Sequence, residues 1–158
     1  MSRIPDALFA QMLPRATAWA EMQARHILER GIGLSERGIE VARHAGVQHP
    51  ERVRLLPVAT IPIPEEADLR QAAQEFGLIT QQTAGLTIGY GIFVLQNCSN
   101  DAKLVAHELM HVAQCENSGG IPGFLVKYLS EVNEYGYPEA PMEQQAIAFA
   151  ESEFPSRD

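Results

Sequence analysis

The residue pattern best suited to chemistry in this chain is H-E-x-x-H, formed by residues 107 to 111. On a helix, positions four apart lie about 40° apart around the axis, so His107 and His111 project from one face and can bind one metal ion. Glu108 lies beside the first of them, where its carboxylate reaches a water on the metal without ligating the metal. The pattern predicts a zinc ion held by two histidines, with Glu108 as general base.

A catalytic zinc site generally has three protein ligands, so a third must join the two histidines. No histidine follows His111, which leaves the acidic residues after the motif: Glu116, Glu131, Glu134, Glu139, Glu143, Glu151, Glu153 and Asp158. Helical periodicity over 141–154 places Glu143 in the middle of an apolar face. An inward-pointing carboxylate needs a cation, so we favour Glu143, with Glu139 as the alternative.

The helix that carries the motif is expected to run from Asp101 to Glu116. The segment 97–101 is rich in residues that cap helix N-termini, and the helix after it is apolar nearly all round, as buried helices are. Burying two imidazoles and a carboxylate without partners is costly, and a zinc ion with its water satisfies them. The open alternative is that these side chains only hydrogen-bond in a core or line an exposed stripe, because the motif also arises by chance.

The rest of the chain predicts the elements that position this helix. Apolar periodicity and capping residues predict further helices over 6–30, 36–45, 64–76, 121–131 and 141–154. The apolar stripe of the first helix is expected to comprise Leu8, Met12, Trp19, Met22, Ile27 and Leu28. Clusters of β-branched residues predict a strand near 53–58 and a strand or tight hairpin over 86–95. The expected fold is α+β, mostly helical, with a small sheet or hairpin beside the motif helix.

Composition limits the possible functions. The chain has 158 residues, 46% hydrophobic and 20% charged, which predicts a single globular domain over 1–158. Residues 1–50 form its helical N-terminal part, and 51–158 hold the strand region and the metal-site helices. The net charge of -8 disfavours nucleic acid and anionic membranes as partners, and with them a helix-turn-helix role for the first two helices. The absence of a long apolar run and of a signal-peptide core predicts cytoplasmic residence.

The two cysteines, Cys98 and Cys115, are expected to be free thiols. The rise of the intervening helix separates their α-carbons by about 20 Å, far beyond the reach of a disulfide. Cys115 follows His111 by four residues and could approach the metal, although a buried structural thiol is favoured.

Two motifs together resemble a known family. Residues 107–114 (HELMHVAQ), Gly119-Gly120 and residues 137–146 (YPEAPMEQQA) resemble a small bacterial zincin metallopeptidase-like domain of the gluzincin type. The resemblance covers roughly residues 86–154. It implies a zincin-like fold, His107 and His111 as zinc ligands, a downstream glutamate as third ligand and a substrate backbone bound by strand addition along 86–95. Position by position, that glutamate is Glu143 and the general base is Glu108.

The resulting hypothesis is a zinc-dependent peptidase that hydrolyses peptide bonds of a peptide or protein substrate. Glu108 removes a proton from a zinc-activated water, which attacks the peptide carbonyl. Among the phenols of Tyr128, Tyr135 and Tyr137, Tyr137 is favoured for stabilising the oxyanion, with plain packing open for all three. The alternative is a zinc-binding partner-interaction module with little turnover, because 158 residues leave little room for a substrate cleft. The sequence does not indicate an oligomeric state.

Overall fold

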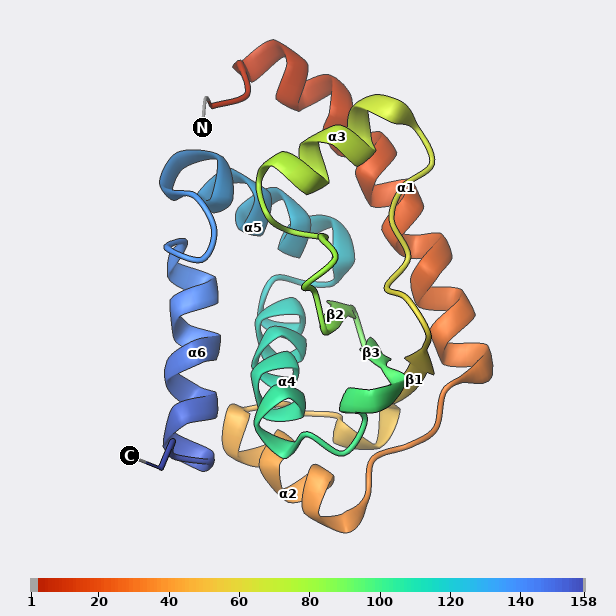
Figure 1. The fold of residues 1–158 in the computed structure, drawn as a ribbon, viewed down its shortest axis with the longest axis vertical. Helices are drawn as coiled ribbons and strands as arrows, with labels where there is room; N and C mark the ends of the chain where they lie inside the picture. The colour runs from red at the N-terminus through yellow and green to blue at the C-terminus, as the bar shows by residue number, and fades with distance from the viewer. Residues whose placement is uncertain (1–2, 158) are drawn as a thin grey trace.

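The computed structural model describes residues 3–157. Over this range the fold is α+β and mostly helical, with six α-helices and one three-stranded mixed sheet, as the sequence predicts (Figure 1). The helices are α1 (Asp6–Arg30), α2 (Glu36–Ala45), α3 (Ala67–Glu75), α4 (Ala102–Asn117), α5 (Ile121–Tyr135) and α6 (Pro141–Glu153). The strands are β1 (Arg54–Val58), β2 (Gly85–Ile88) and β3 (Gly91–Leu95), and short 3-10 helices are η1 (Pro50–Arg52) and η2 (Gln96–Cys98).

The helix boundaries follow from capping residues. The Ser35 side chain accepts a hydrogen bond from the Gly38 backbone N–H at the start of α2, and Gly46 ends that helix in the left-handed conformation at φ 95°. Asp101 caps α4 in the same way by accepting from the Leu104 backbone N–H at 3.0 Å. These side chains satisfy backbone donors that the first turn leaves free, so the elements begin where the sequence predicts.

The sheet has the strand order β1-β3-β2, with β1 parallel and β2 antiparallel to β3. The segment 86–95 is therefore a hairpin, and Gly89 supplies its turn at φ 64°. Successive side chains of β3 point to opposite faces. Ile92 and Val94 pack in the core that includes α2, α4 and α6, whereas Phe93 packs against α1. The sheet is thus sandwiched between α1 and α4, with β2 as an edge strand beside α4.

The buried face of α1 differs from the predicted stripe. Leu8, Met22 and Leu28 are among the exposed large hydrophobic residues, at 44%, 54% and 46% exposure. The buried face instead consists of Met12, Ala20, Ala24 and Ile27. The Ile27 side chain packs directly against Gly91 of β3. A Cβ at Gly91 would lie 2.9 Å from Ile27, so the close approach of helix to sheet requires small residues. A stripe chosen from large apolar residues misses such a face.

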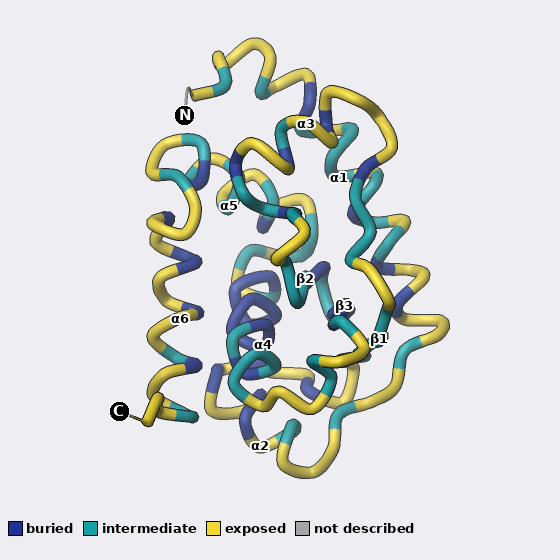
Figure 2. The backbone as a smooth tube through the Cα atoms, viewed as in Figure 1, coloured by how far each residue is buried: buried dark blue, intermediate teal, exposed yellow. Residues whose placement is uncertain are grey.

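Helix α4 is the buried centre of the molecule (Figure 2). Its buried residues run almost without interruption from Ala106 to Cys115 and include Glu108, His111 and Gln114. Throughout residues 3–157, every fully buried side-chain nitrogen and oxygen has a hydrogen-bond partner. None of the helices in this range combines the length and the apolar character needed to cross a membrane.

Candidate metal centre

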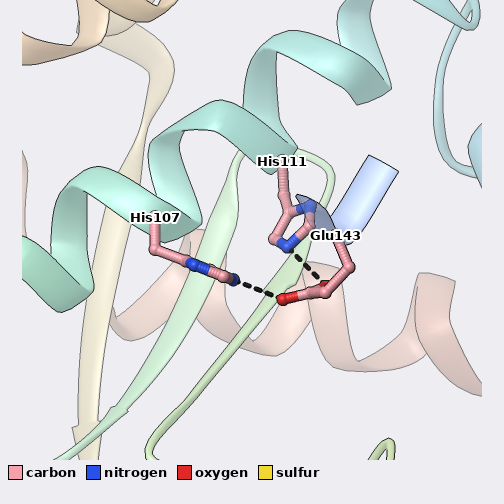
Figure 3. A group of neighbouring side chains, drawn as sticks. All are labelled: His107, His111 and Glu143. Carbon is pink, nitrogen blue, oxygen red and sulfur yellow. Dashed lines mark ion pairs between the residues drawn. The ribbon is translucent and has the colours of Figure 1, made fainter. Parts of the chain in front are cut away.

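Three predicted ligands meet between α4 and α6. His107 Nε2 lies 2.6 Å from Glu143 Oε1, and His111 Nε2 lies 3.1 Å from Glu143 Oε2 (Figure 3). The three potential ligand atoms all lie within 4.8 Å of one another. Glu143 is only 2% exposed and His111 is 6% exposed, whereas the His107 side chain is 19% exposed, so two of the three residues are shielded from water and the third is partly open to it. Two imidazoles and a carboxylate converging in this way form a possible metal-binding group.

Glu143 reaches the histidines because of the way α6 begins and packs. Pro141 occupies the first position of α6, where its missing N–H costs no helical hydrogen bond. Glu131 of α5 accepts a hydrogen bond from the Met142 backbone N–H at 2.8 Å, which fixes the first turn. Met142, Ala146 and other small or apolar residues bury the face of α6 that carries Glu143, and that face packs along α4.

The hydrogen bonds of Gln114 set the tautomer of His111. The Gln114 amide nitrogen donates to the Met142 carbonyl at 2.9 Å and to Gln145 Oε1 at 2.8 Å, so its oxygen faces His111 Nδ1 at 2.8 Å. Nδ1 must therefore carry a proton, and in the neutral imidazole Nε2 presents its lone pair to Glu143. The contact with Glu143 therefore needs a positive charge at Nε2, supplied either by a proton that makes the ring an imidazolium or by a metal ion in its place. The donor set therefore fits a metal ion, with Gln114 orienting a ligand from behind.

The charges of Glu143 and His111 support each other. Burial raises the pKa of Glu143, but hydrogen bonds from His107 and His111 and their positive charge outweigh it and hold the pKa well below its usual value. Burial likewise lowers the pKa of His111, yet Glu143 and Glu108 outweigh it, so the pKa of His111 is raised. The centre therefore keeps an ionised carboxylate in a shielded position, which favours a bound cation.

A second carboxylate stands beside this group without belonging to it. Glu108 is 5% exposed, and its Oε1 accepts a hydrogen bond from Thr87 Oγ1 of β2 at 2.8 Å. The same hydroxyl lies 3.1 Å from the Glu108 backbone carbonyl. Gly85 leaves room for the carboxylate, because a Cβ there would lie 3.2 Å from it. The edge strand β2 thus positions Glu108.

The phenols divide between packing and the site. Tyr128 donates its hydroxyl to Glu143 Oε2 at 2.8 Å, and its ring stacks on Phe124 at 5.3 Å. Burial, followed by the charge of Glu143, raises the pKa of Tyr128 well above 10. Burial also raises the pKa of Tyr137, to about 12, and this residue lines the same cavity as the three ligands. Tyr135 is 54% exposed. The role predicted for Tyr137 in stabilising the oxyanion remains a prediction.

Most of the other acidic residues after the motif have partners outside the group of His107, His111 and Glu143. Glu116 accepts from the Tyr90 hydroxyl and from two backbone N–H groups, and Glu131 accepts from the start of α6. Glu151 pairs with Lys103, and Glu153 lies 2.6 Å from His44. Glu134 and Glu139 are exposed, and Asp158 lies outside the described residues. Both cysteines are free thiols, and burial raises the pKa of Cys115 to about 11.

The sequence alone predicts no role for two residues of the site, Gln114 and Thr87. Gln114 follows His111 by three positions, so helical spacing could have identified it as a neighbour of the ligand. Thr87 had no comparable signal. Its contact with Glu108 depends on how β2 packs against α4, which no local pattern encodes.

A cavity of about 620 Å³ extends from the candidate metal centre between α1, α3, α5 and β2. His107, Glu108, His111 and Glu143 all line it. The sequence predicts little room for a substrate cleft in a chain of 158 residues, but this cavity is large enough to hold part of a substrate. The N-terminal helix and the 59–84 segment supply the walls, so no additional subdomain is required.

No protein-family model matches the chain, and neither curated proteins nor solved structures contain a match to it. The resemblance to zincins therefore rests on the buried group of His107, His111 and Glu143, presented by two helices with four-residue spacing between the histidines. That arrangement is consistent with a zincin-like site and identifies a candidate metal centre.

Proposed function

We propose that the chain is a zinc-dependent peptidase, with His107, His111 and Glu143 as the zinc ligands. The observation that carries this proposal is the position of Glu108, a buried carboxylate next to the ligands that is held by Thr87 and does not join them. A site that only stores a metal needs ligands and no such second carboxylate. A general base, in contrast, must lie within reach of the ligands and remain outside the ligand set.

The residues of the chain divide the chemistry among them. Bound zinc supplies a Lewis acid that acidifies water and polarises a carbonyl group. Glu108 accepts a proton from the attacking water as the water oxygen bonds to the peptide carbonyl carbon. It returns this proton to the leaving amine as the C–N bond breaks. Thr87 occupies Oε1 of Glu108 and leaves Oε2 for the proton.

The phenols take different parts in the proposal. Tyr128 already donates to Glu143, so it holds a ligand in place. Tyr137 lines the cavity and supplies a hydroxyl for the developing oxyanion. The substrate backbone runs along β2, which is the edge strand beside Glu108.

The test compares zinc-loaded wild type with Glu108→Gln on a panel of unfolded proteins, while zinc stoichiometry is measured in both. We expect Glu108→Gln to keep its zinc and to lose roughly 100- to 10,000-fold in cleavage rate, the usual contribution of a general base. Glu134→Gln, at an exposed glutamate on α5, is the matched control and should cleave like wild type.

Two results would contradict the proposal. Undiminished cleavage by Glu108→Gln would remove its role as a base. A zinc-loaded wild type that cleaves no protein of the panel would favour the partner-interaction module instead.

A further inference from the structure

We infer, building on the proposed peptidase function, that the cavity beside the metal centre selects polypeptide substrates by their large apolar side chains, and that α1 and α3 form its selective wall. The resemblance to zincins does not extend to these two helices. Both helices nevertheless line the cavity that the ligands line, through Trp19 and Leu13 of α1 and Leu69 of α3, and Phe76 lines it directly after α3.

The lining of the cavity is divided by chemistry. All its charged side chains and both its histidines come from α4, its capping residue Asp101, and α6. The lining residues of α1, α3, α5 and β2 include no charged side chain. Lys103 and Glu151, at the charged end, pair with each other. The charged residues and histidines thus form one part of the lining, and the rest is mainly apolar. A polar side chain placed against the apolar part would lose its hydration without gaining a partner, whereas an apolar side chain would not.

The size of the cavity suits more than one side chain. A volume of about 620 Å³ falls within the range of roughly 300–1,000 Å³ that is typical of ligand-binding pockets. The apolar lining residues, the ligands and Glu108 all line one cavity. A substrate that reaches the metal centre can therefore place one of its own side chains against the apolar lining. The apolar side chain therefore lies near the bond that is cleaved.

Two features favour a polypeptide over a fatty acid as the occupant. The edge strand β2 lines the cavity, and an edge strand offers backbone hydrogen bonds that suit an extended peptide. At the charged end, the carboxylates of Glu108 and Glu143 offset the charge of a bound zinc ion, so the head group of a fatty acid meets no net positive charge there, whereas a peptide backbone needs none. The net charge of -8 acts in the same direction.

Ion pairs at the surface join α3, which forms one wall of the cavity, to α1. Arg15 of α1 pairs with Glu66, the residue before α3, and its Nη2 lies 2.6 Å from Asp68 Oδ2 in the first turn. At the other end of α3, Phe76 packs with Val132 of α5. The apolar end of the cavity is therefore a built pocket with walls from three helices.

Trp19 allows occupancy to be measured without catalysis, because it is the only tryptophan of the chain and lines the cavity. The protein is zinc-loaded Glu108→Gln, which preserves the ligands. The probes are a short peptide with Leu and Phe at alternate positions and a matched peptide with Ser and Gln at those positions. We expect a saturable change in Trp19 fluorescence with the apolar peptide and none with the polar peptide. The same difference is expected when the titration is repeated with the metal-free variant.

Two variants of α1 distinguish the effect of a side chain that fills the cavity from the effect of adding a large side chain elsewhere on the helix. Ala16 lines the cavity, whereas Ala18 is exposed on the same helix and does not line it. Ala16→Phe should weaken binding of the apolar peptide by roughly tenfold or more, in keeping with the selectivity of apolar pockets. Ala18→Phe adds the same side chain and should bind like the parent protein. In otherwise wild-type enzyme, kcat/KM should favour the apolar peptide by a similar factor, and Ala16→Phe should remove this preference.

The outcomes distinguish failure of this inference from failure of the proposed function. Equal binding of both peptides, cleavage of both at equal rates, or an unchanged response in Ala16→Phe overturns the apolar selection even when hydrolysis is found. Binding of the apolar peptide to wild type without cleavage supports the selective wall and contradicts the peptidase. Decanoate is tested in parallel, and a Trp19 response to decanoate but not to the apolar peptide identifies a lipid site and overturns the inference.

Discussion

Each functional side chain of the candidate metal centre is held by a second residue behind it. Gln114 fixes His111, Tyr128 donates to Glu143, and Thr87 donates to Glu108. These contacts come from α4, α5 and β2, so the orientation of the three groups depends on elements other than the motif itself. Mutation of a residue that orients a metal ligand typically costs roughly 10- to 100-fold in metal affinity or activity.

Replacement of Gln114 should therefore weaken metal binding without removing a ligand. Gln114→Met has a similar length, but it neither accepts from His111 Nδ1 nor donates to the Met142 carbonyl. We expect zinc affinity to fall by roughly 10- to 100-fold, as is usual for a residue that orients a histidine ligand. Competition with a chromophoric chelator measures this change.

Gln74→Met is the control, because Gln74 is an exposed residue of α3. It should leave the zinc affinity of wild type unchanged. If Gln114→Met also bound zinc like wild type, the tautomer of His111 would not depend on Gln114, and the chemical fit of the site to a cation would lose its main support.

Among the helices, α3 depends on few contacts with the rest of the fold. The ion pairs of Arg15 with Glu66 and Asp68 join its N-terminal end to α1, while Phe76 anchors the other end. Arg15→Met keeps the aliphatic stem and removes both ion pairs. We expect backbone amides over 67–75 to exchange hydrogen roughly two- to fivefold faster, a factor in line with surface ion pairs. Hydrogen exchange followed by mass spectrometry measures this.

Arg25→Met, at an exposed position further along α1, is the matched variant and should leave exchange in α3 at the wild-type rate. Equal exchange in wild type and Arg15→Met would mean that apolar packing alone holds α3. The wall of the cavity would then be no more mobile without the ion pairs.

At the level of elements, local signals were enough to locate helices and strands. Ser35, Gly46 and Asp101 act through their own turns, so the boundaries of α2 and α4 could be predicted from the sequence. The buried face of α1 could not. It depends on the close approach of Ile27 to Gly91, residues that are far apart in the chain.

The site shows the same division. His107 and His111 could be proposed from the spacing of the H-E-x-x-H motif, and Glu143 from its place on the apolar face of a predicted helix. The contact of Thr87 with Glu108 and the cavity between α1, α3 and α5 arise only when those elements pack together. Periodicity describes one element at a time, so it gives no measure of the space between three of them.

Across the whole molecule, the candidate metal centre joins two helices that carry much of the central core. Zinc at about 100 times its dissociation constant should stabilise the folded chain by about 2.7 kcal/mol, if it binds only the native state. For a chain of 158 residues that unfolds in one step, this corresponds to a rise in Tm of roughly 5–10 °C. Thermal unfolding with zinc and with a chelator measures the difference.

The rise in Tm should disappear in Glu143→Ala and persist in Glu139→Ala, since Glu139 is exposed and outside the group. The zinc-induced change is compared within each variant, because loss of the buried Glu143 also alters the stability of the metal-free protein. A rise that persists in Glu143→Ala and disappears in Glu139→Ala would transfer the third ligand to Glu139.

The division of the group between α4 and α6 also has a consequence for biosynthesis. A ribosome makes His107 and His111 before Glu143, and α6 must leave the ribosome before it can pack against α4. Until then the nascent chain carries two imidazoles without their carboxylate partner. The group of His107, His111 and Glu143 is therefore complete only once α6 has been made and has docked against α4.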